Sequence, residues 1–238
     1  MGEDQPHDGA AAAPYADREE AARALAAELD RATTGTLRGR RDAVVLGLAR
    51  GGVPVAAGIA ETLALDWDAL IVRKLGIPGH SEVAFGAVAA HGPRTAEHRV
   101  GSVLRSMPRH ISRGQLHRVE REEAAELRRR QQEYLHGRIV PFADRTVVLV
   151  DDGLATGATM HAAVDVVRSA GAARIVIAVP VGPPEVCAQL AASVDLLVCP
   201  CRPVDFRAVG ASYRRFDQVD DAEVRDLLDR RPRDPGPD

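Results

Sequence analysis

Residues 147–160 read VVLVDDGLATGATM, and this stretch carries more structural information than any other in the chain. The apolar run at 147–150 is typical of a parallel strand covered on both faces, where continuous apolar residues replace alternation. Residues 160–170 carry apolar side chains at helical spacing and predict a helix. The loop between them therefore lies between the carboxyl end of a strand and the amino end of a helix, where free N–H groups and the helix dipole attract phosphate.

The loop contains residue types that suit a phosphate ligand, whereas the two aspartates that precede it do not. Gly157 allows a tight turn and close approach of the backbone to an anion, while Thr156 and Thr159 offer hydroxyl donors. Asp151 and Asp152 would repel a phosphate, so we expect them to accept hydrogen bonds from sugar hydroxyl groups beside it. A ligand with a phosphate at one end and a vicinal diol at the other fits this order, and ribose 5-phosphate is such a ligand.

The segment resembles the binding motif for 5-phosphoribosyl 1-pyrophosphate (PRPP) in the type I phosphoribosyltransferases, in which two acids precede a T-G-x-T loop. The resemblance implies that Asp151 and Asp152 bind the ribose 2- and 3-hydroxyl groups. It also implies that the 5-phosphate is held by the loop that follows, which consists of Ala155, Thr156, Gly157, Ala158 and Thr159.

Strands that alternate with helices along the chain predict an α/β domain with a mostly parallel central sheet and helices on both faces. The expected strands lie at 44–48, 69–72, 147–150, 174–179 and 195–199, and the expected helices at 21–29, 53–63, 111–136, 160–170 and 184–192. A ligand should then lie at the carboxyl ends of the strands. The resemblance implies the same Rossmann-like fold with a small C-terminal hood.

Two upstream segments extend the resemblance. The strand at 44–48 leads into Arg50, Gly51 and Gly52, where the family places its pyrophosphate loop; the glycines would expose backbone N–H groups. The next strand ends at Arg73 and Lys74, and Lys74 is the only lysine in the chain. An arginine–lysine pair at this point contacts the pyrophosphate of PRPP in the adenine and orotate members, which implies the same catalytic role here.

Residues 75–110 are rich in Gly, Pro, His and Ser and predict a long flexible loop, a class of segment that is usually functional or disordered. The family has a loop here that closes over the reacting centre. Within it Glu82 is a candidate catalytic acid or base, because its surroundings resemble the loop of adenine phosphoribosyltransferase; a surface carboxylate is the equal alternative. Ala155 stands where the hypoxanthine and guanine members carry a general base, so an adenine-like or orotate-like arrangement fits better.

The reaction implied by the resemblance is displacement at C1 of the ribose, with pyrophosphate as leaving group. Mg²⁺ is the implied cofactor, held mainly by PRPP oxygens and water, so no protein metal site is expected. Cys187, Cys199 and Cys201 do not form a disulfide framework, and reduced, partly buried thiols are expected.

The acceptor is the least determined part of the interpretation. The hood is expected at about 200–218, with Phe206 and Tyr213 as candidates for stacking on a base, although core packing explains both equally well. No residue set selects one heterocycle. Two functions remain: a transferase that uses PRPP and a small heterocyclic acceptor, or a regulator that senses PRPP or a nucleotide on the same fold. A P-loop or dinucleotide binder is disfavoured because neither glycine motif occurs.

The composition of the chain indicates which classes of partner it binds and how it is divided into a domain and its ends. A net charge of −3 gives no bulk attraction to nucleic acid, and no apolar run reaches membrane-spanning length. The N-terminus lacks the features of a signal peptide, so the cytoplasm is expected. Residues 17–229 should form one phosphoribosyltransferase domain, with disordered segments at 1–16 and 230–238. The resemblance makes a homodimer an open possibility.

Overall fold

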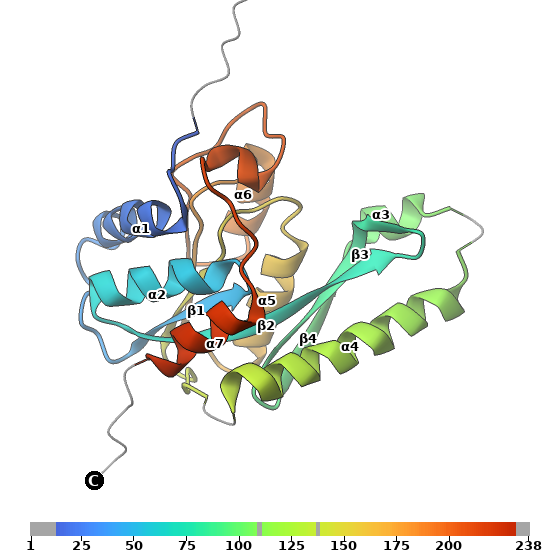
Figure 1. Ribbon diagram of the computed structural model, residues 1–238, viewed down its shortest axis with the longest axis horizontal. Coiled ribbons are helices and arrows are strands. Elements are labelled where there is room, and N and C mark those ends of the chain that lie inside the picture. Colours follow the sequence, from blue (N-terminus) through green and yellow to red (C-terminus); the bar gives the residue numbers. More distant parts are fainter. Residues whose placement is uncertain (1–12, 109–110, 137–138, 232–238) are drawn as a thin grey trace, which may run out of the picture.

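The computed structural model describes residues 13–108, 111–136 and 139–231, with only the backbone described at 81–82. Within these residues the centre of the molecule is a seven-stranded sheet in the order β4-β3-β2-β1-β5-β6-β7 (Figure 1). Its strands are β1 (Ala43–Ala49), β2 (Asp66–Ile77), β3 (His80–His91), β4 (Arg94–Arg99), β5 (Thr146–Val150), β6 (Arg174–Ala178) and β7 (Leu196–Val198). Neighbours among β1, β2, β5, β6 and β7 pair in parallel, and β3 and β4 pair antiparallel.

Helices cover both faces of the sheet. One face packs against α1 (Arg18–Ala32), α2 (Gly52–Leu63), α4 (Arg113–Leu135) and α7 (Asp221–Asp229). The other face packs against α5 (Ala158–Ser169) and α6 (Pro184–Ala191), while the short α3 (Gly101–Ser106) lies at the far end of the β3 hairpin (Figure 1). The predicted mostly parallel α/β fold with helices on both faces is confirmed.

The central strands are apolar throughout because both of their faces are buried. In β5, Val148 points into the core beneath α1 and α2, whereas Val147 and Leu149 point into the core beneath α5. Successive side chains point to opposite faces and all of them are apolar, as a parallel strand covered on both faces requires. Parallel pairing of β1 with both β2 and β5 brings three carboxyl ends to the same edge of the sheet.

The prediction of a long loop over 75–110 is wrong for most of that segment. β2 continues to Ile77, turns at Gly79, which has a φ of +79°, and returns as β3, after which β4 and α3 follow. The hairpin projects from the body beside α4 (Figure 1) and closes over a small core of its own, formed by Leu75, Ile77, Phe85, Ile111 and Leu116. The glycines and polar residues predict a loop, but the apolar residues pack together across the hairpin and against α4.

Residues just outside the expected domain bounds of 17 and 229 make specific contacts with the folded body. Residues 1–12 and 232–238 lie outside the described part, but Tyr15 is buried and forms a parallel bridge with Tyr213. At the other end Arg231 forms an ion pair with Asp68, a fully buried carboxylate in β2. The chain is therefore anchored at Tyr15 and at Arg231, because each residue has a specific partner in the folded body.

The anchor at Arg231 gives a stability prediction. Asp68 also accepts hydrogen bonds from the backbone N–H groups of Ala69 and Val140, both at 2.9 Å, but Arg231 is its guanidinium partner. We expect Arg231→Met to lower the free energy of unfolding by about 3 kcal/mol, because it leaves a buried charge with reduced compensation. Urea denaturation measures the loss, with the exposed Arg230→Met as the matched control. Equal midpoints for both variants would contradict the anchoring role.

Candidate active site

A cavity of about 630 Å³ opens at the carboxyl ends of β1, β2 and β5. Its walls come from the loops that follow β1 and β5, from the second half of β2, from α4 and from the hood. The side chains and backbone that line it belong to Arg18, Leu48, Ala49, Arg50, Gly51, Val72, Arg73, Lys74, Gly76, Glu123, Arg130, Asp151, Asp152, Gly153, Ala155, Thr156, Gly157, Thr159, Val209, Phe216, Asp217, Gln218 and Val219. This location agrees with the edge of the sheet at which a ligand was expected.

The loop between β5 and α5 presents backbone and hydroxyl groups to the cavity. Gly157 has a φ of +75° and stands at the N-cap position of α5, so the free N–H groups of the first turn lie at this end of the helix. A side chain at Gly157 would also meet Val186 of α6, at 2.9 Å from the first carbon. Ala155, Thr156, Gly157 and Thr159 line the cavity, whereas Ala158 is buried beneath it.

Asp151 and Asp152 form an acidic floor next to this loop. The N–H of Asp152 donates to Oδ1 of Asp151 at 2.9 Å, which fixes the first carboxylate against the backbone of the second. Burial raises the pKa of Asp151 well above its ordinary value, and the neighbouring charge of Asp152 raises it further. Burial also raises the pKa of Asp152, although the Arg18 guanidinium opposes that rise. Both acids therefore hold their negative charge at a cost that a hydrogen-bonding ligand would reduce.

The glycine pair after β1 packs directly against the two acids. A Cβ on Gly51 would collide with the carboxylate of Asp152. A Cβ on Gly52 would collide with the carbonyl oxygen of Val150 and lie 2.9 Å from Cα of Asp151. Gly51 lines the cavity and Gly52 lies behind it, so the two glycines join the loop after β1 to the loop after β5.

The cavity also has a basic wall formed by Arg50, Arg73 and Lys74, and these side chains differ in their ion-pair partners. Arg50 pairs with Asp221 of α7 at 3.4 Å, and Arg73 pairs with Glu123 of α4 at 2.6 Å. Lys74 is exposed at the cavity and has no ion-pair partner among the described residues. The lysine is therefore the cation most readily available to an anionic ligand.

Several cavity residues were missed by the sequence analysis. Arg18, Glu123, Arg130 and Phe216 come from helices or segments far from the motifs, and no local pattern marks them. The charged residues of α4 form ion pairs on the exposed side, such as Arg129 with Glu126, and also on the side that meets the cavity, where Glu123 pairs with Arg73.

The predicted hood aromatics do not line the cavity. Tyr213 is buried, its hydroxyl donates to the carbonyl oxygen of Asp152 at 2.6 Å, and its ring stacks on Phe216 with centroids 4.8 Å apart. Phe206 packs against the same cluster, so both residues serve core packing and Phe216 is the aromatic residue that reaches the cavity. The side chain of Glu82 lies outside the described part of the chain.

Within the described ranges no group of three or more His, Cys, Asp or Glu side chains gathers as a metal site. Cys187, Cys199 and Cys201 are free thiols, and the first two are buried. No helix in the described part of the chain is long and apolar enough to cross a membrane.

Comparison with known proteins adds an independent finding. Residues 15–187 match the family described as "Phosphoribosyl transferase domain". Proteins of two Mycobacterium tuberculosis strains, each provisionally named a phosphoribosyl transferase, are 43% identical over 221 residues, or 92% of this chain and 47% of theirs. This chain thus spans about half the length of those relatives. A crystal structure of a Thermus thermophilus protein shows 39% identity and a TM-score of 0.71, covering 90% of this chain and 97% of the other.

Proposed function

Because the chain belongs to the phosphoribosyl transferase domain family, we propose that it binds PRPP in this cavity and transfers the 5-phosphoribosyl group to a nitrogen heterocycle, with release of pyrophosphate. The observation that carries the proposal is the meeting of the loop after β1, the loop after β5 and the second half of β2 at one cavity. Their acidic, basic and N–H donor groups match the polar parts of PRPP.

The acids and the loop at 155–159 suit the ribose phosphate half of PRPP. Asp151 and Asp152 accept hydrogen bonds, as a vicinal diol requires, and the start of α5 offers the N–H donors that a phosphate requires. The basic wall of Arg50, Arg73 and Lys74 suits the pyrophosphate half. The polarity of the cavity therefore supports one orientation of the ligand, with the ribose phosphate near the acids and the pyrophosphate near the basic wall.

The proposed reaction breaks the bond between C1 of the ribose and the pyrophosphate oxygen and forms a bond from C1 to the acceptor nitrogen. The electron pair of the broken bond stays with pyrophosphate, and the acceptor nitrogen gives its proton to water or to the departing pyrophosphate. Arg50, Arg73 and Lys74 would stabilise the negative charge that develops on the leaving group. Ala155 lines the cavity and cannot titrate, so it takes no part in the proton transfer.

Mg²⁺ fits this cavity as a cation that enters with PRPP. The oxygen donors on the floor are the carboxylates of Asp151 and Asp152, and Asp152 is already engaged with Arg18. Such a donor set suits contacts to the water molecules of a hydrated cation, which is how Mg²⁺ is commonly held beside phosphate groups. When bound, the cation would neutralise charge on the pyrophosphate.

Lys74 gives a test of the basic subsite that needs no acceptor. We expect Lys74→Met to weaken binding of inorganic pyrophosphate by about thirtyfold, since a cation beside an anionic group is removed from a partly exposed site. Binding of ribose 5-phosphate should weaken by less than about fivefold, because Lys74 forms no ion pair with Asp151 or Asp152 and acts on those acids only at longer range. Calorimetric titration of both ligands measures this, with the charge-conserving Lys74→Arg as the control. Equal weakening of the two ligands would contradict separate subsites.

The function itself is tested by a screen of acceptors. Purified protein with Mg²⁺ and PRPP is incubated with purine bases, pyrimidine bases and orotate, and pyrophosphate release is measured. We expect release with one class of acceptor and none without it. PRPP binding without release for any acceptor would favour the sensing alternative, and absence of PRPP binding would refute the proposal.

A further inference from the structure

Arg18 reaches the acidic floor of the cavity from the start of α1, and its guanidinium group is held on several sides. Nε and Nη2 donate to Oδ2 of Asp152 at 2.9 and 2.7 Å, and Nη1 donates to the carbonyl oxygen of Asp217 at 2.7 Å. Its Cζ lies 4.0 Å from the ring centroid of Phe216. With the Arg18 side chain only 14% exposed and that of Asp152 only 15%, this pair belongs to the interior of the site.

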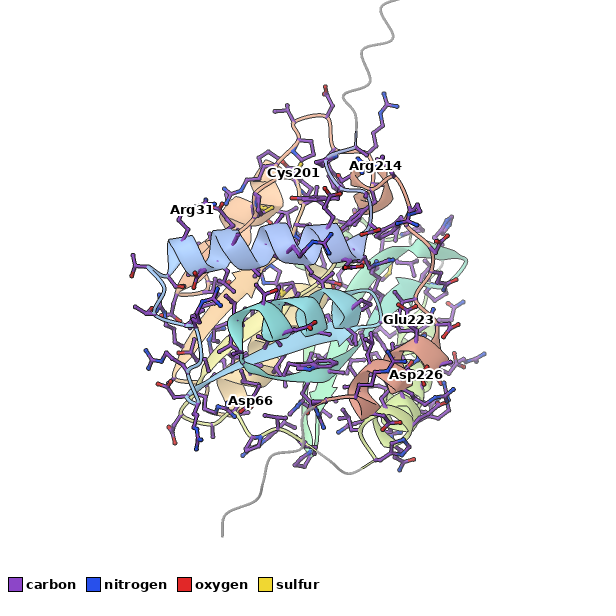
Figure 2. All side chains as sticks on the ribbon, turned by 60° about the vertical axis from the view of Figure 1, so that its left-hand side comes forward. Arg31, Asp66, Cys201, Arg214, Glu223 and Asp226 are labelled. Atoms are coloured by element: carbon purple, nitrogen blue, oxygen red, sulfur yellow. The ribbon has the colours of Figure 1, made fainter. Side chains whose placement is uncertain are left out.

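The chain before Arg18 is docked so that the arginine arrives at this point. The backbone N–H of Tyr15 donates to Ser212 at 3.1 Å, and the N–H of Arg214 donates back to Tyr15 at 2.9 Å. The N–H of Arg215 then donates to Ala16 at 2.8 Å. Figure 2 shows Arg214 at the end of the molecule where the described N-terminal segment lies against the hood. The N-terminal segment therefore pairs with the hood through backbone hydrogen bonds, and this pairing places Arg18 at the cavity.

We propose that Arg18 is a positioning residue for PRPP, which keeps the Asp152 carboxylate ionised and turned so that Oδ1 is left for a ribose hydroxyl group. This inference rests on the proposed function. Both guanidinium hydrogen bonds to Asp152 end on Oδ2, so the pair does not use Oδ1. An oxygen held in this way is ready to accept a hydrogen bond without first having to be oriented.

The surroundings of Asp152 explain why a cation is needed there. The titratable groups that face it are Asp151, Lys74 and Tyr213 in addition to Arg18. Asp151 repels its charge, and burial raises the pKa of both acids. Without Arg18 the two neighbouring carboxyls would hold a proton at higher pH, and a protonated carboxyl accepts hydrogen bonds less strongly. Removal of Arg18 should therefore make PRPP binding depend on pH.

The test compares PRPP affinity of the full chain and its variants across pH. In Arg18→Met we expect PRPP with Mg²⁺ to bind about thirtyfold more weakly than in the wild type near pH 6.5, and about threefold more weakly near pH 9. Taking the ratio at each pH cancels the titration of PRPP itself. Arg18→Lys should restore much of the affinity at the lower pH, because it retains the charge.

Arg23→Met is the matched control. Arg23→Met removes an exposed arginine of the same helix that pairs with Glu19, and should leave PRPP affinity unchanged. A loss in Arg18→Met that is the same at every pH, or no loss, would overturn the inference. If the wild type fails to bind PRPP, the proposed function falls, and the role of Arg18 in holding the charge of Asp152 is then judged from the ligand-free protein.

The ligand-free measurement separates those two failures. Without Arg18 the folded-state pKa of Asp152 should rise further above its unfolded value. The folded chain then binds the extra proton below that pKa, so stability falls as pH rises through it. Unfolding of Arg18→Met should therefore become easier relative to the wild type as pH rises, and this difference should vanish when both proteins carry Asp152→Asn. A difference that does not change with pH overturns the charge-holding role whether or not PRPP binds.

Discussion

Asp151→Asn is expected to weaken binding of ribose 5-phosphate and of PRPP by more than about a hundredfold, because hydrogen bonds to a buried charged acceptor contribute roughly 1.5–3 kcal/mol each. The amide oxygen of the variant can still accept the hydrogen bond from the N–H of Asp152, so the backbone at this point should keep its place. Binding of inorganic pyrophosphate should change by less than about threefold, since that ligand belongs to the basic wall.

The same substitution should stabilise the ligand-free protein. The pKa of Asp151 is raised by burial and by the charge of Asp152, so the folded chain binds a proton more tightly than the unfolded chain does. Stability therefore falls as pH rises through the folded-state pKa, and asparagine removes that loss. We expect Tm to rise by about 3 °C at pH values above that pKa and the gain to vanish in acid, where the carboxyl is protonated in both states.

Asp151→Asn is expected to lower ligand affinity and to raise stability, and this combination makes the prediction specific. Calorimetric titration gives the affinities and a thermal melt series across pH gives the stability. Glu61→Gln is the matched control, because it makes the same chemical change at an exposed position of α2 and should alter neither quantity. If Asp151→Asn lost stability and affinity together, the carboxylate would be a structural group and the assignment to the ribose diol would be refuted.

The parts of the fold that were predictable are those with continuous apolar runs. β1, β5 and β6 lie between helices whose apolar residues recur at helical spacing, so each local pattern agrees with the final packing. The hairpin of β2 and β3 was not predictable in the same way. Leu75, Ile77 and Phe85 are separated by glycines and polar residues, and their burial depends on Ile111 and Leu116 of a later segment.

The residues of the candidate active site divide in the same way into those that a local pattern predicts and those that it does not. Asp151 to Thr159 follow one another along the chain at the end of a single strand, so their order alone indicates a ligand with a sugar and a phosphate. Arg18 reaches Asp152 across 134 positions of sequence, and Glu123 reaches Arg73 across 50. Such residues enter the site through the packing of α1 and α4, which a local pattern does not encode. The glycine pair lies between these cases, because its position was predictable and its contact with the acids was not.

That contact leads to the second large prediction, which concerns Gly52. In Gly52→Ala the new methyl group would collide with the carbonyl oxygen of Val150 and lie 2.9 Å from Cα of Asp151. Both obstacles are backbone atoms, so no side chain can turn aside to make room. The loop after β1 and the loop after β5 would have to separate, and overpacking of this kind costs about 3 kcal/mol. The two acids and the loop after β1 would then no longer hold their relative positions.

We therefore expect Gly52→Ala to weaken PRPP by more than about a hundredfold, because both halves of the ligand lose their alignment at once. Ribose 5-phosphate and pyrophosphate should each lose less than PRPP does, since each contacts one loop alone. The control is Gly114→Ala in the first turn of α4, where the nearest atom is Oγ of Ser112 at 3.8 Å and alanine favours the helix. A Gly52→Ala protein that binds PRPP as the wild type does would show that the two loops act independently, because the ligand spans both and would register any change in their separation.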